Sequence, residues 1–258
     1  NKVYNIQCPD QRIIDLKFIP HQDVRLAILT DTNAGSRSVK AYTFNRKFLR
    51  LEEITRLSVD LLHDSTSSII VPFAHGDHEK PVYLVLGTET ISLVFKTGVV
   101  NTDSGFEGSA PQCYCELGGW SSLVATNSGS LYGLYFDSQF NMFKIGDISI
   151  LPTSITKIDG NIFFIGSSCG DSVFAQITND SIQILQEIPQ FTPVNSISSF
   201  CESVGSIFLT QGNNKTSSIS ELKTGTTFIK EVEISFPYIE SIFSTCDHYL
   251  ILSLFNDH

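Results

Sequence analysis

A recurring hairpin pattern constrains the fold of this chain more than any other feature. A short apolar run passes through a small polar turn into a second apolar run, which is typical of antiparallel strands. The turns centre on residues 34, 88, 128, 168 and 213, which are 54, 40, 40 and 45 residues apart. The first runs of the five copies are Leu26–Leu29, Tyr83–Leu86, Ser122–Ala125, Ile162–Ile165 and Ile207–Thr210.

A period of this length predicts an all-β fold, a β-propeller in which each repeat is one blade of a few strands. A β-sandwich is the alternative, but it gives no reason for the regular spacing. Helical spacing of apolar residues is limited to Arg50–Leu62. Weaker strands that complete the blades are expected at Ile13–Ile19, Ser68–Phe73, Ile145–Leu151, Phe228–Ile234 and Ile239–Ser244.

The five repeats are fewer than we expect for a closed ring. The chain stops at His258 soon after the apolar run Tyr249–Phe255, which reads as a strand cut off at its turn. An open ring exposes strand edges and the faces between blades. We therefore expect the segment to belong to a longer polypeptide that supplies the missing blades.

Composition bears on the partners. The 17 Lys and Arg residues are scattered and outnumbered by 27 Asp and Glu, so the formal net charge is −10. Direct binding of nucleic acid needs clustered cations and is not expected. Charged residues make up only 17% of the chain and hydrophobic ones 41%, which favours a surface covered by partners. No apolar run approaches the roughly 20 residues that span a bilayer.

Six cysteines without a C-x-x-C pair indicate reduced, mostly buried thiols in an intracellular protein. One of them lies in the sequence Gly-Ser-Ser-Cys-Gly at Gly166–Gly170, which matches the nucleophile elbow of serine hydrolases. An elbow needs a helix after the serine, whereas Ser172–Ile177 alternates like a strand. We predict a hairpin whose two glycines supply turn dihedrals, with no catalytic role for Ser168 or Cys169.

The remaining chemical motifs are weak. His75-Gly76-Asp77-His78 offers two imidazoles and a carboxylate, but zinc usually needs further ligands on ordered elements. We therefore expect a solvated loop there. No P-loop, dinucleotide fingerprint or isolated carboxylate pair occurs. We expect neither a metal nor a cofactor, and we expect the chain not to be an enzyme.

Several segments, taken in order, resemble the damaged-DNA-binding protein 1 family, whose members also include large subunits of cleavage/polyadenylation and splicing factors. Arg12–Phe18 and Val39–Tyr42 are similar to two family motifs. The most specific match is Ile162–Ser167 followed by Gly170-Asp171-Ser172. Thr192–Val194 and Leu250–Ser253 also fall where the family has related sequences. Thr210–Asn214 and Ser218–Gly225 depart from the family pattern and suggest a divergent fungal paralogue.

The resemblance implies a non-catalytic scaffold built from three propellers, the first of them seven-bladed. Residues 1–247 would be later blades of that first propeller, and residues 248–258 would begin the second.

By the same resemblance, the whole protein is an adaptor of a cullin-4-type ubiquitin ligase in DNA-damage or heterochromatin pathways. Such an adaptor is nuclear, with a cytoplasmic pool possible, and its segment here contacts neither nucleic acid nor membrane. The alternative is a scaffold of mRNA 3′-end processing or splicing.

The family's first propeller, together with its third, clamps a helix of a substrate receptor, and the cullin binds elsewhere. The positions implied to face the receptor are Cys169, Pro193, Val194, Asn213 and Asn214. The last two are polar where the family is apolar, which leaves the identity of the receptor open.

Overall fold

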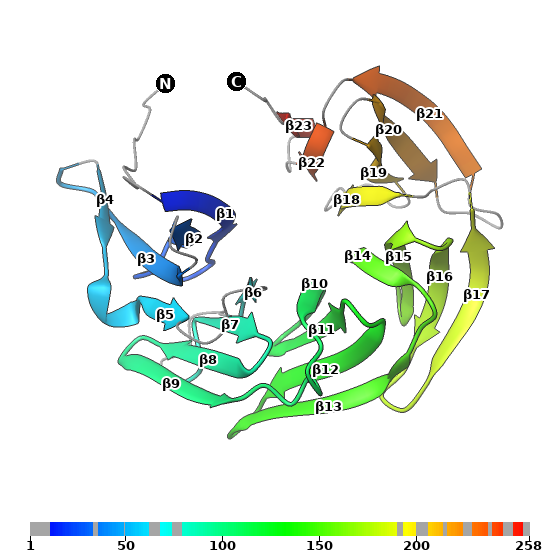
Figure 1. The fold of residues 1–258 in the computed structure, drawn as a ribbon. Coiled ribbons are helices and arrows are strands. Elements are labelled where there is room, and N and C mark those ends of the chain that lie inside the picture. Colours follow the sequence, from blue (N-terminus) through cyan, green and yellow to red (C-terminus); the bar gives the residue numbers. More distant parts are fainter. Residues whose placement is uncertain are drawn as a thin grey trace. The chain divides into compact units, whose positions relative to one another are not determined.

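The computed structural model is nearly all β and forms the blades of a β-propeller, as the hairpin spacing predicts (Figure 1). None of the helices that it describes is long and apolar enough to cross a membrane. The described residues are 11–32, 36–48, 50–61, 68–73, 79–189, 193–199, 206–213, 216–223, 229–236, 239–244 and 250–254.

Five blades follow one another along the chain (Figure 1). The strands of blade 1 are β1 (Gln11–Phe18), β2 (Leu26–Thr32), β3 (Arg37–Asn45), β4 (Arg50–Glu53) and β5 (Val59–Leu61), which pairs with β3. Those of blade 2 are β6 (Ser68–Pro72), β7 (Tyr83–Gly87), β8 (Thr90–Phe95) and β9 (Gly98–Asp103). Those of blade 3 are β10 (Pro111–Gly118), β11 (Ser121–Thr126), β12 (Ser130–Phe136) and β13 (Phe140–Asp147).

Blades 4 and 5 have the same design, and a final hairpin follows them. The strands of blade 4 are β14 (Leu151–Asp159), β15 (Ile162–Cys169), β16 (Ser172–Ile177) and β17 (Ile182–Ile188). Those of blade 5 are β18 (Val194–Ser199), β19 (Ser206–Asn213), β20 (Thr216–Lys223) and β21 (Ile229–Phe236). The last hairpin consists of β22 (Ile239–Ser244) and β23 (Leu250–Leu254), which lie on the two sides of the domain boundary predicted at 247/248.

Blades 2 to 5 are antiparallel meanders in which every strand pairs with its neighbour in sequence, and β1–β4 of blade 1 follow the same order, with β5 added beside β3. The connection between the second and third strands therefore lies at one end of a blade. The connections between strands one and two, and between strands three and four, lie at the other end. The chain also leaves for the next blade at the end that carries the second-to-third connection. This geometry decides which turns can act together.

The chain divides into two compact units, each with its own core. Unit 1 is Asn1–Pro111 with Gly118–Ser121 and Tyr135–Met142, and unit 2 is Gln112–Leu117 with Ser122–Leu134 and Phe143–His258. Both cores consist mainly of β-branched, leucine and aromatic side chains, most of them from the second and third strands of the blades. Among the largest fully buried ones are Ile28, Leu29, Ile70, Tyr83 and Leu84 in unit 1 and Phe164 and Phe174 in unit 2.

All five predicted hairpins are confirmed, but one predicted strand is wrong, and the one stretch with helix-like spacing does not form an α-helix. Ile145–Leu151 is not one strand, because β13 ends at Asp147 and β14 begins at Leu151. Arg50–Leu62 is not a helix in its described part, because β4 and β5 flank a single 3₁₀ turn at Thr55–Leu57. Leu57, Val59 and Leu61 are buried in the core of unit 1. Pairing with β3 and burial thus outweigh a helix-like spacing.

Tyr83 links the two blades of unit 1. Its hydroxyl donates a 2.7 Å hydrogen bond to the carbonyl of Leu57, and both groups are buried. Burial raises the pKa of the Tyr83 phenol far above its usual range, so the hydroxyl stays a donor throughout the accessible pH range.

We predict that Tyr83→Phe destabilises the fold by about 1–3 kcal/mol, because the buried Leu57 carbonyl loses its donor. Urea unfolding followed by circular dichroism measures the change. An unfolding midpoint equal to that of the unsubstituted chain would contradict this role.

Candidate functional site

The Gly-Ser-Ser-Cys-Gly motif forms the second-to-third connection of blade 4. Strand β15 runs beside β14 as far as Cys169, but its pairing with β16 ends at Ile165 and Val173, so the connection between the two strands spans Gly166–Ser172. Gly170 has a φ of +87°, a conformation that favours glycine. A strand, not a helix, follows the motif. It is therefore a hairpin turn and lacks the geometry of a nucleophile elbow.

The other glycine of the motif serves a different purpose from the one predicted. Gly166 lies within β15, and its φ is outside the left-handed region. A Cβ at this position would lie 2.6 Å from the Ser154 hydroxyl oxygen and 2.6 Å from a methyl carbon of Val194. Gly166 is needed because β14 and the start of β18 approach its backbone closely.

Ser167 forms buried hydrogen bonds that hold the turn. Its side chain is completely buried, and its hydroxyl donates to the carbonyl of Leu151 (3.3 Å) or Cys169 (2.6 Å). The same oxygen accepts from the Cys169 amide at 3.2 Å, and the Ser167 amide donates to the Ser172 hydroxyl at 3.1 Å. Ser168 and Cys169 are exposed beyond this network. The tip is thus held in one conformation although it faces solvent.

Thr153 joins this hairpin to the next blade. Its hydroxyl lies 3.2 Å from the Gly166 carbonyl and 2.5 Å from the Val194 carbonyl, within reach of both. The strand β18 therefore begins beside the base of the Cys169 hairpin. Pro193 is half-buried, whereas the Val194 side chain has no exposed surface. A partner that binds here can contact Pro193 and backbone atoms, because the buried Val194 side chain is packed beneath them.

The predicted partner-facing residues of blade 5 lie at the same end as the Cys169 hairpin of blade 4. Val194 is the register partner of Gln211, so β19 passes Pro193 as it runs on to Asn213. The expected turn at Gly212-Asn213-Asn214 starts later than predicted, because Gly212 and Asn213 still pair with Ser217 and Thr216. The structure describes the backbone of Asn213, and Asn214 lies outside the described residues. Four of the five predicted partner-facing residues are thus placed at one end of blades 4 and 5.

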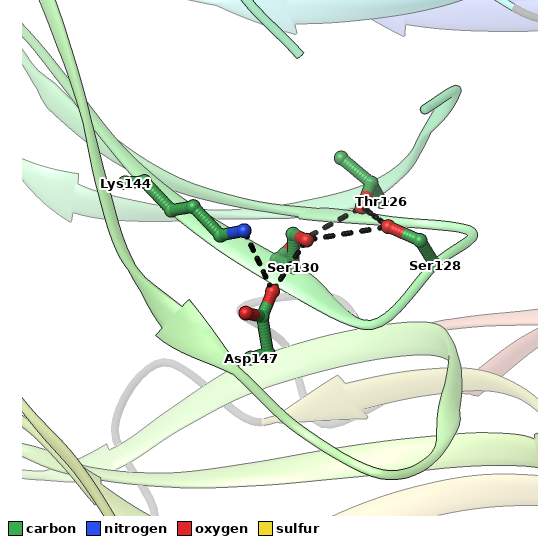
Figure 2. Close-up of polar contacts among 5 residues, drawn as sticks. All are labelled: Thr126, Ser128, Ser130, Lys144 and Asp147. Atoms are coloured by element: carbon green, nitrogen blue, oxygen red, sulfur yellow. Dashed lines mark hydrogen bonds and ion pairs between the residues drawn. The ribbon is translucent and has the colours of Figure 1, made fainter. Parts of the chain in front are cut away.

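A related polar network supports the corresponding hairpin of blade 3 (Figure 2). Ser130 donates a 2.6 Å hydrogen bond to Asp147, and Lys144 forms a 3.0 Å ion pair with the same carboxylate oxygen. The hydroxyl of Ser128 lies 2.9 Å from that of Thr126 and 3.3 Å from that of Ser130. These bonds hold the pKa of Asp147 below its usual range, chiefly through Ser130 and then Lys144.

A hydroxyl also bonds at the second-to-third connection of blade 2, and hydroxyls bond across the second and third strands of blades 1 and 5. In blade 1 the hydroxyls of Thr30 and Ser38 are 3.2 Å apart across the β2–β3 pair. In blade 2 the Ser104 hydroxyl donates to the carbonyl of Thr88, and in blade 5 the Ser220 hydroxyl donates to Gln211 at 2.8 Å. Hydrogen bonds from hydroxyl groups near the second and third strands thus recur among the blades, as does the order of the strands.

The described thiols differ in exposure. Cys113, Cys115 and Cys169 are free cysteines, and only Cys169 is exposed. Burial raises the pKa of Cys115 to about 11 and raises that of Cys113 further. The expectation of buried thiols holds for Cys113, holds in part for the half-buried Cys115, and fails for the exposed Cys169.

Within the described ranges, no three His, Cys, Asp or Glu side chains are grouped as metal ligands. The predicted loop residues His75 and His78 lie outside those ranges. No protein-family model matches the chain, and no curated protein matches it. The resemblance described above therefore rests on the ordered motifs alone.

Sequence reasoning missed the supporting residues Thr153, Ser167 and Ser172. Thr153 belongs to β14, most of which had not been predicted as a strand. Ser167 and Ser172 are short polar residues inside an apolar hairpin, and such residues usually carry no signal of their own. Their repeated occurrence beside the hairpin turns is a signal that could have found them.

We predict that Gly166→Ala destabilises the fold by about 1–3 kcal/mol, because the new methyl group has no room between Ser154 and Val194. Ser168→Ala is the matched control. Its exposed hydroxyl makes a single long bond of 3.4 Å to the Leu151 carbonyl, so a change within about 0.5 kcal/mol is expected. Equal effects in chemical denaturation would contradict the close-packing role of Gly166.

We also predict that Ser130→Ala raises the pKa of Asp147 towards its ordinary value. The folded pKa is lowered, so the carboxylate bonds are present above the ordinary pKa and are lost as pH falls through the folded pKa. Nuclear magnetic resonance titration of the side-chain carboxyl carbon measures the shift. Asp137, whose pKa is lowered mainly by the amides of Gln139 and Ser138, should be unchanged, and an unshifted Asp147 would contradict the assignment.

Proposed function

We propose that this chain is part of a non-catalytic scaffold of a cullin-4-type ubiquitin ligase, in which it docks substrate receptors. The proposal places the whole protein in the nucleus, in DNA-damage or heterochromatin pathways. Its support is the ordered set of family-like motifs, the most specific of which coincides with the Cys169 hairpin. The fold adds that protein–protein binding is a common use of propeller turns.

The observation that carries the proposal is the fixed surface at one end of blades 4 and 5. Cys169 projects from a hairpin that Ser167 holds by four hydrogen bonds or close polar contacts. Thr153 fixes the neighbouring Pro193–Val194 connection against that hairpin. A receptor helix that binds here has little chain to order, which lowers the entropic cost of binding.

The alternative is a scaffold of mRNA 3′-end processing or splicing, because these factors share the family. The motifs at Ile13–Phe18 and Gly166–Ser172 agree more closely with the damage-binding branch, which favours the ubiquitin-ligase proposal. The two proposals differ in the proteins that accompany the scaffold, so a list of partners separates them.

The test is affinity purification of the tagged full-length protein followed by quantitative mass spectrometry. The ubiquitin-ligase proposal predicts enrichment of a cullin and of at least one receptor protein. Recovery of pre-mRNA processing factors without a cullin would favour the alternative. Recovery of neither would contradict both proposals.

We predict that Cys169→Arg lowers recovery of the receptor about tenfold and leaves recovery of the cullin unchanged, because a bulky cation replaces the exposed thiol at a docking hairpin. Asn179→Arg is the matched control, since Asn179 is exposed at the opposite end of the same blade. If both variants lose the receptor equally, or if neither does, the receptor does not dock at the Cys169 hairpin.

A further inference from the structure

A groove in unit 1 lies at the end of blade 1 that carries the first-to-second and third-to-fourth connections. Its volume is about 990 Å³, similar to that of small-ligand and peptide-anchor pockets. It has a buried floor at Ile19 and aromatic side chains in its walls. The lining residues are Phe18, Ile19, Gln22, Asp23, Arg25, Phe44, Arg46 and Leu51.

Hydrogen bonds fix both walls of the groove. On one side, the buried His21 accepts through Nδ1 from the amides of Asp23 (3.1 Å) and Val24 (3.4 Å). On the other side, Asn45 Oδ1 accepts from the amides of Lys47 (3.0 Å) and Phe48 (3.1 Å). These bonds therefore hold residues 21–24 and 45–48 in shape without a ligand.

The groove is positively charged, whereas the chain as a whole carries a negative net charge. The exposed guanidinium groups of Arg25 and Arg46 line it, and within the described residues neither contacts a carboxylate. The lining acid Asp23 is neutralised by a 2.6 Å ion pair with Lys96. Two cations are thus available in a chain whose formal net charge is −10.

Exposed aromatic surface adjoins these cations. Phe18 is 79% exposed, the highest value among the exposed large hydrophobic side chains of the described residues. Phe48 is 59% exposed and lies on the hairpin that forms one wall, with the Lys47 ammonium 5.4 Å and the Arg50 guanidinium 5.3 Å from its ring centre. Large apolar side chains left exposed beside fixed walls are typical of binding surfaces.

We propose that this groove binds an acidic peptide of a partner protein, with carboxylates on Arg25 and Arg46 and an apolar side chain between Phe18 and Phe44. Guanidinium groups bind carboxylates through two parallel hydrogen bonds, and a buried aromatic or aliphatic anchor supplies much of the affinity. A nucleic acid fits less well, because a net charge of −10 repels a polyanion. The proposal is independent of the cullin assignment.

The test uses fluorescence anisotropy with the 258-residue chain and a short labelled peptide in which aspartates flank a phenylalanine. We expect saturable binding that weakens as salt rises. Arg46→Glu and Arg25→Glu should each weaken binding about tenfold, because an attractive contact becomes repulsive. Phe18→Ser should weaken binding by a similar factor, because the anchor loses its apolar wall.

Arg56→Glu is the matched control, since Arg56 is exposed in the same unit and lies outside the groove. It makes the same change in net charge and should alter binding less than twofold. Equal losses in the Arg46 and Arg56 variants would overturn the proposal.

Three further outcomes would also overturn the proposal. These are equal binding of a peptide with lysines in place of aspartates, tighter binding of single-stranded oligothymidylate, and self-association of the chain that Arg46→Glu abolishes. Circular dichroism of each variant establishes that the blade remains folded, so a loss of binding reports on the groove itself.

Discussion

Small hydroxyl groups at the second-to-third connections of blades 2, 3 and 4 are the interactions on which the shape of these connections depends. The connection to the next blade crosses this end, and in blade 3 the carbonyls of Ile148 and Ile150 come so close to Gly129 that a Cβ there would lie within 3 Å of both. Backbone groups shielded from water in this way need hydrogen-bond partners. Serine and threonine supply them in little space, and the Ser167 and Ser130 networks are the fullest examples.

These buried hydroxyl bonds link the packing of the blades to the shape of the exposed turns that could bind a partner. A turn whose backbone is hydrogen-bonded to buried hydroxyls can expose a thiol at its tip without becoming disordered, as at Cys169. The opposite end of a blade uses different side chains, His21 and Asn45 in blade 1, for the same purpose. The receptor proposal and the peptide groove therefore concern different ends of blades in different units, and each depends on its own set of fixed connections.

The hairpins could be predicted because the second and third strands of a blade are buried on both faces. All five residues of β7 are buried, for example, so the sequence there is a continuous apolar run. The outer strand β17 exposes five of its seven residues and gives no such signal. The resemblance pointed to Cys169 and Pro193. The role of Gly166 and the bonds of Thr153 depend on how two blades are packed, which a single sequence does not reveal.

The central claim, that the exposed hairpin tips are held rigid by buried hydroxyls, is tested most directly by native-state amide hydrogen exchange. The amides of Ser167 and Cys169 donate to the hydroxyls of Ser172 and Ser167. The account predicts that both amides exchange about as slowly as that of Phe164 in the middle of the same strand. Exchange at the rate of an unstructured peptide at Cys169, with Phe164 still protected, would contradict it.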